Sequence, residues 1–171
     1  AGMLSGIKRS SDWGNSWELI NNEIQWTYGQ VRNFAYNNNT LYVALDSNVY
    51  NLRIYKSTNY GNNWSLISQE IPHHQIPYSL YAFDNLLLCG TAAGVYKSTN
   101  SGTNWALIPG ISGNIGLFGF ASVGTKNIFI SAWSYGVYVS NDYGESFTLK
   151  NDGLLSYRCT SLYKFGEYLF L

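Results

Sequence analysis

Charged side chains are scarce in this sequence. Asp, Glu, Lys and Arg make up only 12% of its 171 residues, and ten basic residues balance ten acidic ones, so the formal net charge is zero. A nucleic-acid surface needs a basic excess to release counterions, so the composition argues against such a partner. Soluble domains usually carry about 25% charged residues, and the low share here favours an extracellular or cell-surface location. The 46% of hydrophobic residues exclude a disordered chain.

Cysteine and long apolar runs are scarce as well. The two cysteines, Cys89 and Cys159, each lie in an apolar, strand-like context, and we expect them to be buried thiols. Whether they pair depends on the distance between their Cα atoms, which the sequence does not give. No stretch approaches the ~18 apolar residues of a membrane span. No secretion signal is visible, although a mature chain would have lost one.

Aromatic residues are abundant, at 17% with fifteen Tyr and six Trp, and Asn, Ser, Thr and Gly separate them. This is typical of an all-β protein with many turns. Four segments of the pattern Ser-x-(Asp/Asn)-x-Gly-x-x-(Trp/Phe) recur, with starts 47, 41 and 42 residues apart. Their pattern residues are Ser10, Asp12, Gly14 and Trp17; Ser57, Asn59, Gly61 and Trp64; Ser98, Asn100, Gly102 and Trp105; and Ser140, Asp142, Gly144 and Phe147.

Each pattern residue has a structural role to play in a tight hairpin loop. We expect the Asp or Asn oxygen to accept hydrogen bonds from backbone N–H groups two residues on, and the Ser to close the loop from its other side. Gly supplies a positive φ, and the aromatic ring is buried as the next strand begins. Asn in two copies keeps the oxygen but loses the charge, which suits a turn and argues against a metal site.

Short β-runs lie on both sides of every loop, and two more strands separate successive loops, for example 78–83 and 86–90. The sequence therefore predicts an all-β fold, a β-propeller of four-stranded antiparallel blades with a period of about 42 residues. We place the blade boundaries near 22–30, 69–77, 110–116 and 152–157, in a single domain covering residues 1–171.

The four loops resemble the Asp-box, or bacterial neuraminidase repeat, of sialidases, xyloglucanases, sortilin-type receptors and the photosystem II assembly factor. Segment 94–105, Gly-Val-Tyr-Lys-Ser-Thr-Asn-Ser-Gly-Thr-Asn-Trp, is most similar to secreted bacterial proteins of unassigned function. The resemblance implies that the pattern residues are structural and lie on the face away from any ligand. It implies little about activity, because one fold hosts many functions.

The chain opens at an expected third strand and stops within an expected second strand. The two ends can pair and close a four-bladed ring, the chain can be a segment of a longer propeller, or two chains can complete one ring. We favour the longer ring, because four blades leave a tight centre. The apolar pattern of 159–171 predicts a strand partner for 168–171, since an unpaired apolar edge is an aggregation hazard.

Catalytic signatures are missing. The resemblance to sialidases would require an arginine triad and an Arg-Ile-Pro motif, but the four arginines are scattered and Arg53-Ile54 is followed by Tyr55. Glu23 and Glu70 are repeat-equivalent, which favours a scaffold role over a glycosidase pair. His73 and His74 are adjacent and so point apart on an extended segment, which suits one metal ion poorly. We expect no metal and no cofactor, since no phosphate-binding motif is present either.

Residues found in one blade only are the candidates for function. In propellers, the loops between second and third strands and the connections between blades share the face opposite the repeat loops. Flat aromatics beside polar donors suit sugar rings or a peptide. On this basis we predict a ligand-binding surface formed by Trp26, Tyr28, Trp133, Tyr135, Tyr157 and Arg158.

Three functions remain open. The first is a non-catalytic extracellular module that binds a glycan or protein partner. The second is a fragment of an Asp-box glycoside hydrolase whose catalytic acids lie mostly outside this chain. The third is a purely structural assembly component.

Overall fold

The computed structural model describes residues 2–3, 6–24, 29–47, 51–68, 71–72, 75–112, 117–124, 126–159 and 161–171. These residues form seventeen β-strands and no helix, so none of them belongs to a helix that could cross a membrane. The strands are β1 Gly2–Met3, β2 Gly6–Arg9, β3 Glu18–Leu19, β4 Gln30–Asn37, β5 Thr40–Ser47, β6 Asn51–Ser57, β7 Ser65–Leu66, β8 Pro77–Phe83, β9 Leu86–Thr91, β10 Gly94–Ser98, β11 Ala106–Ser112, β12 Leu117–Val123, β13 Asn127–Ala132, β14 Gly136–Ser140, β15 Thr148–Leu149, β16 Tyr163–Phe165 and β17 Tyr168–Phe170.

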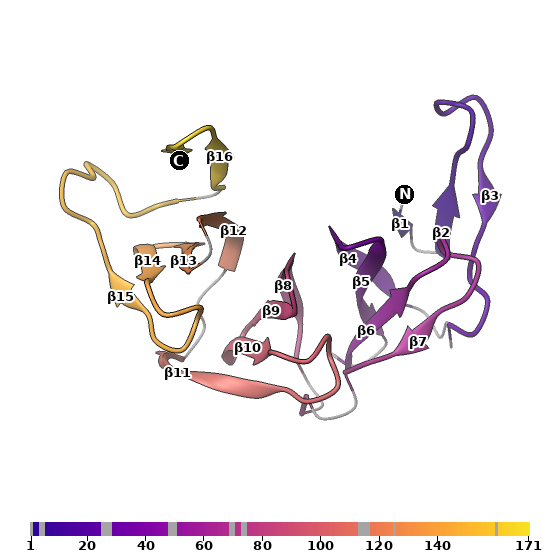
Figure 1. Cartoon of the computed structure of the whole chain (residues 1–171), viewed down its shortest axis with the longest axis horizontal. Helices are drawn as coiled ribbons and strands as arrows, with labels where there is room; N and C mark the ends of the chain where they lie inside the picture. Colours follow the sequence, from indigo (N-terminus) through magenta and orange to yellow (C-terminus); the bar gives the residue numbers. More distant parts are fainter. Residues whose placement is uncertain are drawn as a thin grey trace.

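Three four-stranded antiparallel sheets follow one another, and we call them blade 2 (β4–β7), blade 3 (β8–β11) and blade 4 (β12–β15). The N-terminal part-blade contains β1–β3 and the C-terminal part-blade contains β16 and β17. Figure 1 shows the blades along an open arc, with β4, β8 and β12 on its inner side and β7, β11 and β15 on its outer side. The predicted β-propeller fold is confirmed. The repeat loop lies between the third and fourth strands in blades 2 to 4, and between β2 and β3 in the N-terminal part-blade.

The N-terminus differs from the expectation. The chain does not open at a third strand, because Gly2–Met3 forms a short second strand whose residues pair with Ile7 and Gly6. A two-residue strand has no hydrophobic period from which it could be predicted.

At the other end of the arc, β17 pairs with β16, as expected for the first two strands of a blade. Among the described residues, β17 has no ladder with β2, and the two ends lie apart in Figure 1. The closed four-bladed ring is therefore not formed in this structure.

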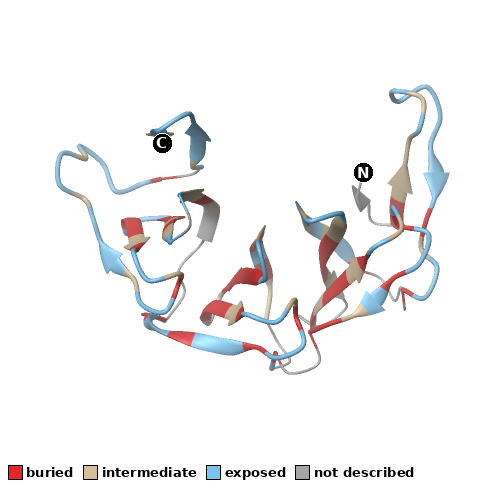
Figure 2. Cartoon of the chain, in the orientation of Figure 1, coloured by how far each residue is buried: buried red, intermediate tan, exposed pale blue. Residues whose placement is uncertain are grey.

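The hydrophobic core lies between blades rather than within a single sheet. Figure 2 shows buried segments in each of the three complete blades. One cluster joins the N-terminal part-blade to blade 2, a second joins blades 2 and 3, and a third joins blades 3 and 4. The β-branched residue that the sequence repeats in the third strand is fully buried in these clusters in three of the four copies, as Ile7, Ile54 and Val95 show. Each blade is thus stabilised by covering the next one.

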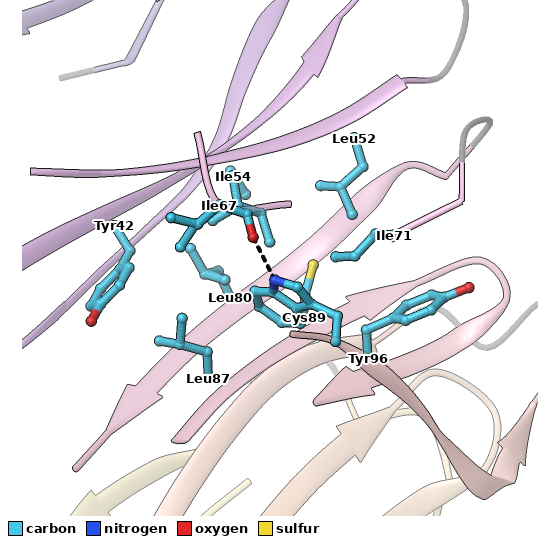
Figure 3. Close-up of a cluster of buried hydrophobic side chains, with 11 residues drawn as sticks. Tyr42, Leu52, Ile54, Ile67, Ile71, Leu80, Leu87, Cys89 and Tyr96 are labelled. Carbon is cyan, nitrogen blue, oxygen red and sulfur yellow. Dashed lines mark hydrogen bonds between the residues drawn. The ribbon is translucent and has the colours of Figure 1, made fainter. Parts of the chain in front are cut away.

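The repeat aromatic connects neighbouring blades. Trp64 Nε1 donates to the carbonyl oxygen of Ile20 at 2.9 Å, across the boundary with the N-terminal part-blade. Trp105 Nε1 donates in the same way to the carbonyl oxygen of Ile67 at 2.7 Å, the bond dashed in Figure 3. Both indoles are buried. The hydrogen bond satisfies the indole N–H while the ring fills the inter-blade core.

The serine and the Asp or Asn hold each loop closed. Ser10 Oγ accepts from the backbone N–H of Gly14 at 2.7 Å and donates to Asp12 Oδ1 at 2.8 Å. Asp12 Oδ1 also accepts from the backbone N–H of Ser16 at 2.9 Å, four residues on rather than the two we expected. The other three loops repeat these bonds, with Asn59 and Asn100 using the amide oxygen.

Two consecutive residues in each loop have a left-handed backbone. Gly14 has φ 93°, as expected for the pattern glycine, but Trp13 before it has φ 58°. The equivalent Tyr60, Ser101 and Tyr143 are left-handed too, at φ 60°, 56° and 62°. The sequence did not reveal this second position, because the residue varies among Trp, Tyr and Ser.

Hydrogen bonding lowers the pKa of the loop carboxyl groups. The Ser16 hydroxyl, followed by the Ser16 backbone N–H and the Ser10 hydroxyl, lowers the pKa of Asp12 to about 2. Asp142 is held by Ser146 and Ser140 in the same arrangement, and its pKa is also lowered. Both carboxyls therefore bind protons more weakly in the folded chain than in the unfolded one.

We predict that these two loops lose stability in acid. Because the folded pKa lies below the unfolded value of about 4, the contribution is present above pH 4 and is lost as pH falls toward 2. Asp12→Asn with Asp142→Asn should therefore flatten the fall of the thermal midpoint between about pH 4 and 2. The midpoint is measured by circular dichroism, with Asp84→Asn in the exposed β8–β9 turn as control. Equal slopes in the native chain and the double variant would contradict the prediction.

Candidate functional site

The turn between β13 and β14 presents two aromatic side chains to solvent. Trp133 is 42% exposed and Tyr135 is 46% exposed. Tyr135 N donates to the carbonyl oxygen of Ala132 at 3.1 Å, which closes the turn. Ser134 and Gly136 have positive φ values of 66° and 89°, which reverse the chain within a few residues.

The connection from β15 to β16 brings two more predicted residues to this turn. Gly136 N donates to the carbonyl oxygen of Tyr157 at 3.0 Å, so the two segments are joined through the backbone. The Arg158 guanidinium carbon lies 5.8 Å from the centre of the Trp133 ring, a cation–π contact. Tyr157 is 53% exposed, and Arg158 is exposed too.

Four of the six predicted ligand-binding residues thus lie together. We call Trp133, Tyr135, Tyr157 and Arg158 the aromatic surface. Trp26 and Tyr28 lie outside the described residues. Leu155, fully exposed between the same two strands as Tyr157, is an apolar side chain that our prediction did not include.

Asn151 positions the turn and was also missed. Its Nδ2 donates to the carbonyl oxygen of Tyr135 at 2.8 Å, and its Oδ1 accepts from the backbone N–H of Val137 at 2.9 Å. A signal was present in the sequence, because a polar residue stands four positions after the aromatic in other copies. Asn21 and Ser68 accept from the equivalent N–H groups of Ile7 and Ile54.

Topology places the aromatic surface away from the repeat loops. In blade 4 the repeat loop joins β14 to β15, whereas the Trp133 turn joins β13 to β14 at the other end of β14. Antiparallel hairpins on successive strands lie at opposite ends of a sheet. The surface therefore shares its end of the sheet with the connections between blades.

Several of the described carboxylates hold the scaffold. Asp46 forms an ion pair with Arg32 at 2.6 Å. Glu23 accepts from Asn63 Nδ2 at 2.7 Å and from Trp64 N at 3.0 Å, so it caps the repeat loop of the next blade. The scaffold role expected for Glu23 is confirmed, whereas Glu70, His73 and His74 lie outside the described residues.

The described part of the chain shows no arrangement of side chains suited to metal binding or to thiol chemistry. Its residues contain no cluster of three or more His, Cys, Asp or Glu side chains that could hold a metal ion. Cys89 and Cys159 are buried, as we expected, and both are free. Burial raises the pKa of the Cys89 thiol well above its usual range, which disfavours the reactive thiolate.

Comparison with known proteins identifies the fold. No family model and no curated protein matches the chain. Among solved structures, the chain is similar to the GH74 enzyme of Niastella koreensis, with 27% identity and TM-score 0.68 over 92% of this chain and 28% of that one. The GH74 xyloglucanase of Xanthomonas campestris has 19% identity and TM-score 0.69 over 93% and 29%. YCF48 bound to D1 peptide has 12% identity and TM-score 0.52 over 88% and 76%.

This chain is a β-propeller. It spans less than a third of the length of the two GH74 enzymes.

Replacing Asn151 should loosen the aromatic surface. Asn151→Ser keeps an acceptor for Val137 N, as Ser68 does in blade 2, but removes the donor to Tyr135. We predict a loss of about 1 kcal/mol in unfolding free energy and faster amide exchange at Tyr135 and Gly136, measured by hydrogen exchange. Asn21→Ser changes the equivalent residue of the N-terminal part-blade and should leave exchange at these two amides unchanged. Unaltered exchange in Asn151→Ser would show that the bond to Tyr135 does not hold the turn.

Proposed function

We propose that this chain is a non-catalytic, extracellular Asp-box propeller module that binds a glycan or a protein through the aromatic surface. The observation that carries the proposal is the contact of Arg158 with Trp133, since it joins two loops into one exposed surface with a guanidinium and flat rings. Aromatic faces stack on the apolar faces of sugar rings, and Arg and Tyr supply hydrogen-bond donors.

The composition supports the same proposal. The chain is neutral overall and only 12% charged, so recognition by long-range electrostatics is weak. Neutral glycans and polar peptide segments are ligands that such a surface can bind by stacking and local hydrogen bonds. The low charge also motivates the extracellular location.

The Asp-box assignment rests on the repeat loops. Their Ser, Asp or Asn, and Gly residues form one hydrogen-bonded unit that repeats in four places. The solved structures with a similar fold include a xyloglucanase and a protein bound to a peptide. Those ligands belong to those proteins, and they motivate the two ligand classes that we test here.

We predict binding of neutral polysaccharides, xyloglucan among them, measured by isothermal titration calorimetry. Trp133→Ala should weaken binding about tenfold or more, because a lost stacking contact costs about 1–2 kcal/mol. Tyr36→Ala, which removes a 65% exposed aromatic near the β4–β5 turn, is the matched control and should bind like the native chain. A peptide library screened in parallel distinguishes a protein ligand. Equal effects of both substitutions on every ligand found would contradict the assignment of this surface.

A second function is favoured by the 27% identity with the Niastella koreensis GH74 enzyme over 92% of this chain. Under this hypothesis the chain is part of a glycoside hydrolase whose catalytic acids lie mostly outside this chain. Asp46 and Glu23 are poor candidates for catalytic acids here, because scaffold contacts occupy both. A purely structural role is the third reading, and the absence of any ligand in both screens would support it.

The purified chain should not cleave polysaccharides. We predict no release of reducing ends from xyloglucan or β-glucan above the rate of a heat-denatured sample, assayed over the pH range from about 4 to 8. A two-carboxylate mechanism requires an acid and a base or nucleophile facing one bond. Turnover that Asp46→Asn abolishes without unfolding the chain would overturn the non-catalytic proposal and establish the second reading.

A further inference from the structure

The C-terminal part-blade repeats the first half of blade 3. Residues 161–165 read Ser-Leu-Tyr-Lys-Phe and residues 79–83 read Ser-Leu-Tyr-Ala-Phe. The register is also the same, since Phe165 faces Tyr168 in β17 as Phe83 faces Leu86 in β9. Tyr163 therefore occupies the position of Tyr81, and Phe165 the position of Phe83.

Inside the arc, these two aromatics contact the following blade. Tyr81 stacks on Phe120 with ring centres 5.8 Å apart, and the Phe83 ring lies 6.2 Å from that of Tyr143. At the C-terminal end of the arc, Tyr163 and Phe165 are 69% and 71% exposed.

The N-terminal end of the arc exposes the complementary partners. Phe34 of β4 has the strand position of Phe120, because the two face the equivalent residues Val43 and Ile130. Tyr60 has the loop position of Tyr143, directly before the pattern glycine, and is 77% exposed. The pairs formed between blades 3 and 4 are thus available between the C-terminal end of one arc and the N-terminal end of another.

A cavity at the N-terminal end matches the side chains of β17. It has a volume of about 340 Å³ and is lined by Ile7, Trp17, Ile20, Phe34, Leu41 and Tyr60, among others. Between blades 3 and 4, the equivalent space is filled by Leu86 and Leu88, which are fully buried. Their counterparts in β17 are Tyr168 and Phe170, at 72% and 55% exposure.

A groove at the C-terminal end matches Trp17. It measures about 160 Å³ and is lined largely by apolar residues, among them Phe129, Val137, Leu154 and Leu169. The equivalent positions in the earlier blades receive the repeat aromatic of the next blade. Trp17 is 50% exposed, whereas Trp64 and Trp105 are 4% and 9% exposed. A Cβ on Gly61 or Gly102 would meet an isoleucine of the preceding blade, but one on Gly14 would meet nothing nearer than Trp17 itself at 3.9 Å.

The strand registers of the two ends are compatible. Beside β10, Leu87, Leu88 and Cys89 face Ser98, Lys97 and Tyr96. The same register places Leu169 opposite Ser10, Phe170 opposite Arg9 and Leu171 opposite Lys8. Among the described residues, β1 pairs only with Gly6 and Ile7, the next positions along β2. A β17 strand from another chain and β1 therefore do not compete for the same residues of β2.

We propose that a second copy of this chain binds at both ends, so that β16 and β17 of each copy and β1–β3 of the other form two composite blades. Each copy supplies three complete blades and half of each composite blade, which gives a ring of eight. Propellers contain about four to eight blades, so two copies fit this range and three do not. A head-to-tail interface of this kind gives a closed ring when its rotation closes.

The mass of the purified chain tests the assembly. Light scattering after size exclusion should give twice the chain mass of 19.2 kDa at micromolar concentration. Phe170→Asp should give a folded monomer, checked by circular dichroism, because the residue is exposed in a single chain. Leu107→Asp, at a 43% exposed leucine of β11 in blade 3 and so away from both ends of the arc, should remain dimeric. A monomeric native chain, or masses that keep growing with concentration, would overturn the proposal.

A disulfide tests the register and separates assembly from internal closure. Arg9→Cys with Phe170→Cys should form a covalent dimer on a non-reducing gel, because the two residues face each other across copies. Arg9→Cys with Glu167→Cys places the second thiol at the β16–β17 turn and should give far less dimer. A disulfide within a monomer would mean that the chain closes on itself, and equal yields for both pairs would show that the ends collide without register. Either result would overturn the proposal.

Discussion

The insertion of one aromatic side chain per repeat into the boundary with the preceding blade is the interaction on which this fold depends. Trp64 and Trp105 each fill part of an inter-blade core and satisfy a carbonyl oxygen of the blade before. The pattern glycine belongs to the same interface, because a Cβ on Gly61 or Gly102 would lie 2.5 or 2.4 Å from Ile20 or Ile67. The serine and the Asp or Asn fix the loop that aims the ring. All four pattern residues therefore serve one contact.

This constraint explains why so much of the fold could be predicted from the sequence. A contact that recurs in every blade leaves the same residues at the same spacing, and the strands on either side inherit their positions from it. The exceptions lie where repetition stops. Gly2–Met3 was missed because its partner strand, and not its own sequence, makes it a strand. The left-handed residue before each pattern glycine was missed because its side chain varies while its backbone does not.

The candidate site shows the limit of the same reasoning. Trp133, Tyr135, Tyr157 and Arg158 could be predicted because they are specific to one blade and topology brings their loops together. The contact of Arg158 with Trp133 could not, since it depends on side-chain conformations at the ends of two different connections. Asn151 was missed in the sequence analysis for the opposite reason. It shares a repeat position with Asn21 and Ser68, and a filter that assigns shared positions to the scaffold discards a residue that holds a blade-specific turn.

The division between scaffold and surface follows from strand geometry. The loops between third and fourth strands are committed to inter-blade packing, so their sequences are restricted by contacts on both sides. The turn between the second and third strands of blade 4 need only reverse the chain, and Asn151, a polar residue after the repeat aromatic, holds it through Tyr135 and Val137. Side chains on that face are therefore free to vary without loss of the core. In blade 4 this freedom has produced Trp133, exposed at the surface and in contact with Arg158 from the following connection. A binding surface placed there changes one turn and one connection, and it leaves the packing of every other blade intact.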